Sequence, residues 1–257
     1  MTTDERIEIE ANAMRKATKL LTDNFVKTPE DFNIENILAY SDCLLMEEEM
    51  NNTEGRITIS DSISIITVNK MRNGGFRNYI ISHELGHKYT SELMRTFVDA
   101  GTFYRKNTAE ETAANQFAAE LLMPKHFFTD FTNGKELNFE LMNSVANKFN
   151  TSLTSSCIRY AHHGEVPSAF ILSQDGVIKW SAISDDFENQ NLINHMVKSQ
   201  AVNNYFNFNV QTTGEREVVG SDWIRIDKNY KNGTVLIEEN FYLPKYKSVI
   251  TMLKEVD

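Results

Sequence analysis

The chain has 257 residues, 41% of them hydrophobic, and a formal net charge of −10 at pH 7. This length allows two domains with hydrophobic cores of their own, and the acidic balance disfavours direct binding to the phosphates of nucleic acids. No stretch approaches the roughly 18 apolar residues of a membrane span, and the acidic start lacks a signal-peptide pattern, so we expect a cytoplasmic protein that does not bind membranes.

The first segment has the periodicity of an amphipathic helix. Apolar residues recur at three- and four-residue steps from Ile7 to Phe25, which predicts one buried helix face. Asp4 and Glu5 suit the N-terminus of this helix, because the helix dipole is positive there. A helix that binds a membrane surface would carry a basic polar face, so we expect this one to pack in the core.

Two short strands and a helix are expected next. Residues 56–60 and 63–69 are rich in β-branched side chains and partly alternate, which predicts two strands. Two glycines at 74–75 separate them from a segment that begins at Phe76 and has apolar residues at helical spacing. This order of elements, strands followed by such a helix, is typical of zincin-like folds.

The predicted helix carries the most specific motif of the chain. His83, Glu84 and His87 follow the HExxH pattern, which is typical of zinc peptidases. Histidines four residues apart lie above one another on a helix, so both imidazoles can bind one metal ion. Glu84 then stays available as a general base. The longer metzincin motif is absent, because Thr90 and Leu93 stand where it needs glycine and a third histidine.

A third protein ligand is expected on a later helix. Residues 108–124 read as one helix that ends at Pro124, and Glu110 and Glu111 lie in its first turn. Thr108-x-x-Glu111 is also a capping box, in which Glu111 would only satisfy the backbone at the helix start. In that case Glu110 would be the ligand. The capping argument therefore leaves both Glu110 and Glu111 as candidates for the third ligand.

Two motifs together resemble the ImmA/IrrE family of metallo-endopeptidases: HELGH at 83–87 and ExxANxFAAxLLMP at 111–124. The resemblance covers about residues 50–165 and implies that Glu111 is the third zinc ligand. Asn115 follows one turn later, where we expect it to hydrogen-bond the second nitrogen of a ligand histidine. Ala113 departs from the family pattern, which often has an acidic residue there, but this removes no expected ligand.

Residues 139–163 are expected as two helices with a break near residues 150–152, an arrangement similar to a helix-turn-helix. Lys148 and Arg159 are the only cations in this segment, apart from its terminal histidines, which argues against DNA contact. Cys43 and Cys157 have no CxxC spacing, so we expect both to be buried, reduced thiols.

The C-terminal part is expected to be a small α+β module. Asp175-Gly176 lies between two apolar runs and predicts a β-hairpin. A helix is expected at 187–202, and strands at 218–226 and 234–243. We therefore divide the chain into a peptidase domain, residues 1–165, and a C-terminal module, residues 166–257. In some members of the family that the chain resembles, the corresponding region is similar to a ligand-sensing domain, so a sensory or docking role and a packing or dimerising role are the alternatives for this module.

The expected fold class is α+β, with a zincin-like core of the gluzincin type, a helical bundle and this module. The expected activity is hydrolysis of a peptide bond, with one Zn²⁺ per chain held by His83, His87 and Glu111 and with Glu84 as general base. Tyr104, His126 and Tyr160 are candidates for stabilising the oxyanion.

The resemblance implies a protein substrate, namely a cytosolic helix-turn-helix transcriptional repressor whose cleavage relieves repression, often under stress. The alternative is a catalytically silent zinc-binding regulatory protein that sequesters its partner. Glu84 argues against this alternative, because a general base is useful only for chemistry. A third possibility is hydrolysis of a small amide.

Overall fold

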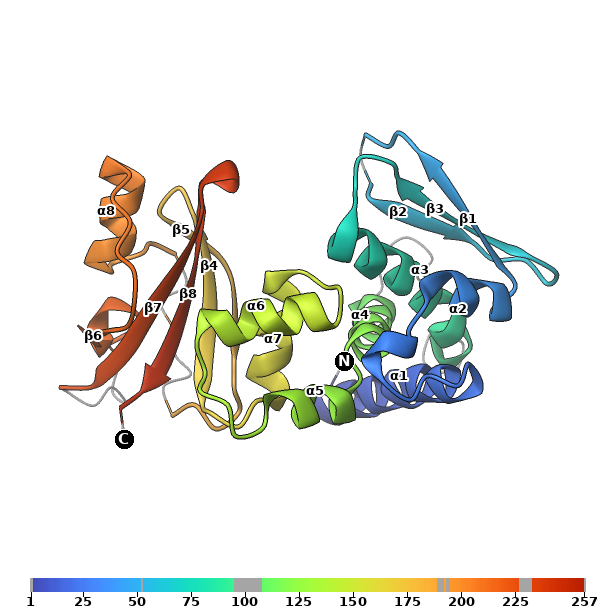
Figure 1. Cartoon of the computed structure of the whole chain (residues 1–257), viewed down its shortest axis with the longest axis horizontal. Coiled ribbons are helices and arrows are strands. Elements are labelled where there is room, and N and C mark those ends of the chain that lie inside the picture. Colours follow the sequence, from blue (N-terminus) through green and yellow to red (C-terminus); the bar gives the residue numbers. More distant parts are fainter. Residues whose placement is uncertain are drawn as a thin grey trace. The chain divides into compact units, whose positions relative to one another are not determined.

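The computed structural model describes residues 2–51, 53–94, 108–188, 192, 195–226 and 233–256. The chain forms two compact units (Figure 1). Unit 1 comprises residues 1–130 and 145–152, and unit 2 comprises residues 131–144 and 153–257. The chain passes from one compact unit to the other three times, after residues 130, 144 and 152. The domain boundary at residue 165 stays a prediction.

Unit 1 combines helices with a small sheet. Its elements are α1 Thr3–Asp23, α2 Ile34–Tyr40, β1 Cys43–Glu48, β2 Gly55–Thr58, β3 Ser64–Asn69, α3 Gly74–Met94, α4 Thr108–Leu122 and most of α5 Lys125–Thr132, with a short 3₁₀ turn at Pro29–Asp31. The N-terminal helix is confirmed, and a capping box starts it, in which the Glu5 N–H donates to Thr2 Oγ1 over 3.3 Å and the Thr2 N–H donates to Glu5 Oε2 over 2.7 Å. The expected buried face is wrong at both ends, because Ile7 is 59% exposed and Phe25, beyond the helix, is 80% exposed. The buried residues of α1 are Ile9, Ala13, Ala17, Leu20 and Leu21. Helix α5 was not predicted.

The sheet of unit 1 has the strand order β1-β3-β2. β1 runs parallel to β3, and β2 runs antiparallel to it. The two predicted strands are confirmed as β2 and β3, whereas β1 was not predicted. This order leaves β2 at an edge of the sheet, next to helix α3.

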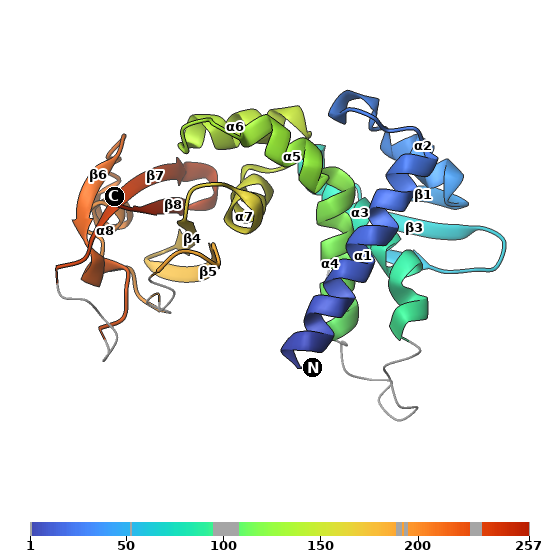
Figure 2. The same cartoon turned by 90° about the horizontal axis from the view of Figure 1, so that it is seen from below.

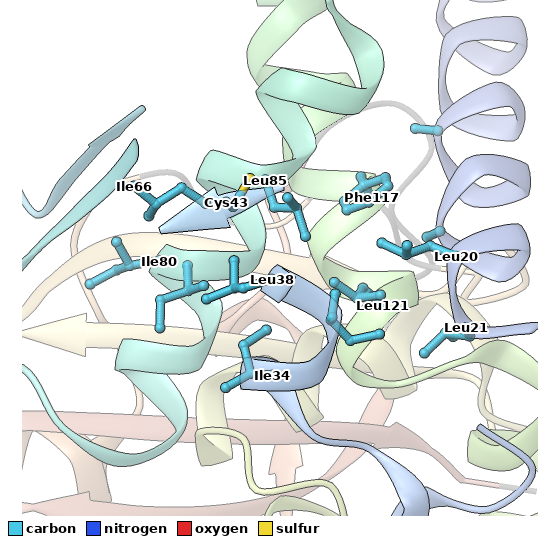
Figure 3. Packing of buried hydrophobic residues seen from close by; sticks show 14 of the residues in the cluster. Leu20, Leu21, Ile34, Leu38, Cys43, Ile66, Ile80, Leu85, Phe117 and Leu121 are labelled. Atoms are coloured by element: carbon cyan, nitrogen blue, oxygen red, sulfur yellow. The ribbon is translucent and has the colours of Figure 1, made fainter. Parts of the chain in front are cut away.

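Helices α1, α3 and α4 enclose the core of unit 1 together with α2 and the sheet. Figures 1 and 2 both show α1 alongside α4. The buried side chains labelled in Figure 3 come from four helices and two strands: Leu20, Leu21, Ile34, Leu38, Cys43, Ile66, Ile80, Leu85, Phe117 and Leu121. Tyr89 of α3 stacks on Phe117 of α4 with 5.3 Å between ring centroids. Apolar burial of this kind is the main force that holds α3 against α4.

Unit 2 is built around an antiparallel sheet with the strand order β5-β4-β8-β7-β6. Its elements are α7 Leu153–His163, β4 Ser168–Gln174, β5 Val177–Ile183, α8 Gln200–Phe208, β6 Arg216–Val219, β7 Val235–Leu243 and β8 Ser248–Glu255, with 3₁₀ turns at Gly220–Asp222 and Pro244–Tyr246. Helix α6 Phe139–Lys148 contributes residues to both units. The fold class α+β is therefore confirmed.

The predicted hairpin and the predicted helix pair are confirmed. Asp175 and Gly176 join β4 to β5 with φ angles of 51° and 76°, which the two-residue hairpin turn requires. Arg159 is 3% exposed, and Lys148 forms an ion pair with Glu30. Of the two cations in this segment, one is thus buried and the other is paired with a carboxylate.

Two predictions for the C-terminal part are wrong. Among the described residues of the helix expected at 187–202, the helix starts only at Gln200. Before it, the Val197 N–H donates to the Gly176 carbonyl over 3.0 Å, which ties Val197 to the hairpin turn. Phe187, Leu192 and Val197 are buried in the core of unit 2 at five-residue steps, which is not helical spacing, and Met196 is 61% exposed. The strand expected at 218–226 ends at Val219, where Gly220 starts a 3₁₀ turn. Strand β8 was not predicted.

Glu238 of β7 is the most deeply buried carboxylate of unit 2, with 0% exposure. It accepts hydrogen bonds from Trp223 Nε1 over 2.7 Å and from Ser199 Oγ over 3.1 Å. Asn240 Nδ2 also donates to this carboxylate, and Arg216 forms an ion pair with it. A buried charge needs such partners, so this network ties β6, β7 and the start of α8 together.

The described cysteines Cys43 and Cys157 are free and buried, as expected. Burial raises the pKa of the Cys43 thiol above its usual range. Among the described residues, no helix has both the length and the apolar character needed to cross a bilayer.

Candidate metal centre

Helix α3 presents both motif histidines on one face. His83 and His87 are one turn apart, and their Nε2 atoms are 3.1 Å from each other. The rings meet edge to face, with 4.7 Å between centroids and an angle of 90°. Two imidazole nitrogens therefore point at the same small volume, as the HExxH spacing predicts.

Glu111 of α4 completes the cluster. Its Oε2 lies 3.5 Å from His83 Nε2, and its Oε1 lies 3.9 Å from His87 Nε2. Among the described residues, His83, His87 and Glu111 form the one group with ligand atoms close enough to hold a metal ion together. Glu110, the other glutamate that the sequence left open, is not in this group.

The donor set fits a zinc ion. Ligand atoms about 2.0–2.1 Å from one tetrahedral zinc are roughly 3.3 Å from one another. The distances of 3.1, 3.5 and 3.9 Å between the three donors surround that value. The side chains are 17%, 24% and 36% exposed in the order His83, His87 and Glu111, so substrate and water can reach the cluster. Two nitrogens and one carboxylate leave a fourth position open, as in catalytic zinc sites.

A glycine allows the two helices to meet at this cluster. A Cβ atom placed on Gly86 would lie 2.9 Å from both Cα and the carbonyl oxygen of Ala114 on α4. Any larger residue at position 86 would therefore push against the backbone of α4. The same close approach brings Glu111, three residues before Ala114, to the histidines of α3.

Asn115 and Tyr79 lie behind His83. The Nδ1 atom of His83 is 2.9 Å from Asn115 Oδ1, which is the contact expected from the sequence. Tyr79 Oη donates a hydrogen bond of 2.6 Å to the same Oδ1 atom. Burial and the negative charge of Glu111 raise the pKa of Tyr79 above its ordinary value. The sequence offered one sign of Tyr79: it precedes His83 by four residues and thus shares its helix face.

Glu84 lies against the edge strand β2. It is 9% exposed, and a Cβ atom on Gly55 would stand 3.0 Å from Glu84 Oε1 and 2.5 Å from Ile80 Cγ2. Only glycine leaves room for this carboxylate beneath the strand. No motif in the sequence singles out Gly55, because the contact joins two elements that the sequence does not relate.

One of the three candidates for oxyanion stabilisation lies among the described residues of unit 1. Tyr104 is outside the described residues, and Tyr160 belongs to unit 2. His126 lines a separate groove of about 860 Å³ between α1 and α5, together with Arg15 and Lys125. His126 is therefore not part of the metal cluster.

Comparison with known proteins gives one family and one fold. Residues 38–160 match the model of the IrrE N-terminal-like domain. A solved structure of a Mycobacterium tuberculosis transcriptional regulator aligns with a TM-score of 0.59 and 13% identity, over 100% of this chain and 89% of that chain. At this identity the likeness shows the fold alone. A search of curated proteins finds no significant match.

Proposed function

Residues 38–160 belong to the IrrE N-terminal-like family of the ImmA/IrrE peptidases, and on this premise we propose that the protein is a zinc-dependent endopeptidase. The observation that carries the proposal is the cluster of His83, His87 and Glu111, with Glu84 next to His83 in the sequence of α3. A metal site without catalysis needs the three ligands only. A nearby carboxylate that is buried against the edge strand is what hydrolysis adds.

The proposed chemistry assigns one role to each side chain. His83, His87 and Glu111 would hold the zinc ion, which supplies Lewis-acid activation of water and of the scissile carbonyl when bound. Glu84 takes a proton from the attacking water and returns one to the nitrogen of the leaving amine. The third ligand is a glutamate on a later helix, so we class unit 1 as a zincin-like core of the gluzincin type.

The edge strand β2 supports a peptide as substrate. Among the described residues its sheet partner is β3, so its other edge can pair with an extended segment. Main-chain hydrogen bonds to a sheet edge bind a peptide in a fixed direction with little demand on its sequence. A segment paired to β2 passes Gly55, and therefore passes next to the carboxylate of Glu84.

We further propose that the substrate is a helix-turn-helix transcriptional repressor and that the cut takes place in the cytosol and relieves repression. The resemblance to ImmA/IrrE peptidases supports this substrate class. The fold shared with a protein described as a transcriptional regulator is in line with a regulatory role.

The metal centre is tested by zinc content and cleavage together. We expect about one zinc per chain in the wild type, retention of zinc in Glu84→Gln, and loss of zinc in Glu111→Ala. Glu110→Ala is the matched control, because this neighbouring glutamate on α4 is outside the cluster. Loss of zinc in Glu110→Ala and not in Glu111→Ala would contradict the assignment of the third ligand.

The substrate is tested by labelling new protein N-termini in a lysate of the source cells. Zinc-loaded wild type is compared with Glu84→Gln, and the new termini are identified by mass spectrometry. We expect them in a helix-turn-helix repressor and only with the wild type. New termini in unrelated proteins alone would refute the substrate class, and identical termini with both proteins would favour the sequestering protein over the peptidase.

A further inference from the structure

We propose that Tyr79 is a positioning residue that prepares His83 for metal binding through Asn115. The inference rests on the proposed metal centre and adds a residue to it. Tyr79 does not reach the ligand nitrogens, since its hydroxyl bonds to Asn115, on the Nδ1 side of His83. Its effect therefore passes through the amide.

The three groups form a continuous path from α3 to α4 and back. Tyr79 and His83 are four residues apart on α3, with 6.0 Å between ring centroids. Asn115 is on α4, four residues after Glu111, so it shares a helix face with that proposed ligand. Its Oδ1 atom stands 2.6 Å from Tyr79 Oη and 2.9 Å from His83 Nδ1.

This path decides which nitrogen of His83 carries the proton. A carbonyl oxygen has two lone pairs and donates nothing, so it can accept from the tyrosine hydroxyl and from an N–H at His83 Nδ1 at the same time. A proton on Nδ1 leaves the lone pair of Nε2 free. Nε2 is the atom that lies 3.5 Å from Glu111 and 3.1 Å from His87 Nε2, on the metal side of the ring.

The opposite orientation of the amide would have the opposite effect. If Asn115 turned its NH₂ group toward His83, that group would donate to Nδ1 and the proton would move to Nε2. Metal binding would then have to reverse both steps. The tyrosine hydroxyl donates to Oδ1 over 2.6 Å, and turning the amide would replace this short O–H···O hydrogen bond with an N–H donated to the hydroxyl oxygen, which is ordinarily a longer bond. Tyr79 therefore favours the orientation in which His83 can bind metal.

The matched experiment compares two tyrosines of α3. Tyr79→Phe removes the hydroxyl that donates to Asn115. Tyr89→Phe removes a hydroxyl that instead lies 2.8 Å from Ser41 Oγ. Zinc affinity is measured by competition with a chromogenic chelator, and the melting temperature of the metal-free protein is measured for both. We expect about a 10-fold loss of zinc affinity in Tyr79→Phe, as for other residues that hold a metal ligand, and no loss in Tyr89→Phe.

A double-mutant cycle distinguishes orientation from packing. Asn115→Asp presents only acceptor oxygens to His83, so the orientation no longer depends on Tyr79. We expect the cost of Tyr79→Phe to fall from about 10-fold to about 2-fold or less in the Asn115→Asp background. An equal cost in both backgrounds, or no cost in either, would overturn the proposal.

The outcome is distinguishable from that of the proposed function. A wild type that binds zinc and shows the expected cycle but cleaves nothing would refute the peptidase and retain the role of Tyr79. A wild type that takes up no zinc would refute both. A lower melting temperature in Tyr79→Phe with unchanged zinc affinity would show that the hydroxyl only stabilises the fold.

Discussion

Gly86→Ala tests whether the close approach of α3 and α4 positions the metal ligands. The added Cβ would stand 2.9 Å from Cα and from the carbonyl oxygen of Ala114, whereas ordinary contacts start at 3.4 Å. The helices must then separate by about 0.5 Å at the crossing, the difference between these two distances. The neighbouring atoms are backbone, so no side-chain rotation can relieve the contact.

Two opposing effects set the change in stability. Alanine in place of glycine inside a helix gains about 1 kcal/mol, while overpacking a buried contact costs about 1–3 kcal/mol. We therefore expect a net loss of about 0–2 kcal/mol in the free energy of unfolding. Glu111 is three residues before Ala114 and moves with α4, away from its present distances of 3.5 and 3.9 Å to the histidines. Zinc affinity should fall by about 10-fold or more, as for other changes that shift a metal ligand.

The assay is chelator competition for zinc together with urea unfolding of the metal-free protein. Gly75→Ala is the matched control, because its Cβ would also meet backbone atoms, those of Thr151, but at the first turn of α3. We expect it to lower stability and leave zinc affinity unchanged. Wild-type zinc affinity in Gly86→Ala, with a gain in stability of about 1 kcal/mol, would refute the reasoning.

Three further changes test the base and the core of unit 2. Gly55→Ala should keep zinc and slow cleavage, because its Cβ would displace the Glu84 carboxylate from under β2; unchanged turnover would count against this position of the base. Glu238→Ala should destabilise unit 2 by about 3–5 kcal/mol, because it leaves the charge of Arg216 without its partner. The unfolding can be measured by fluorescence, since both tryptophans lie in unit 2. Burial raises the pKa of Glu239 in the folded state, so its charged form costs stability as pH rises through that pKa. Glu239→Gln should thus be more stable than the wild type at about pH 7. At about pH 3, below the usual glutamate pKa of about 4.3, the two proteins should be equally stable. An equal gain in stability at about pH 7 and at about pH 3 would contradict the burial argument.

Local patterns predicted most elements of unit 1 and the position of the motifs. The N-terminal helix, β2, β3, α3 and α4 were all expected, because their periodicity or composition is visible within a few residues. Helix α2, strand β1 and helix α5 are short, and the sequence analysis predicts none of them. In the segment expected as a helix at 187–202, the Val197 N–H donates instead to the Gly176 carbonyl of the hairpin turn. No local sequence pattern encodes this long-range contact.

The sequence by itself determined the proposed metal ligands: the HExxH spacing places two imidazoles one helical turn apart, and the motif at 111–124 supplies a carboxylate on a second helix. Helix geometry is local, so spacing along the chain is enough to predict which side chains share a face. Only the tertiary structure decided between Glu110 and Glu111 as the residue next to the histidines, and only it showed Tyr79 behind Asn115 and Gly55 above Glu84. These contacts depend on the distance and the register at which two elements pack. The volumes of all the side chains between the elements set both quantities.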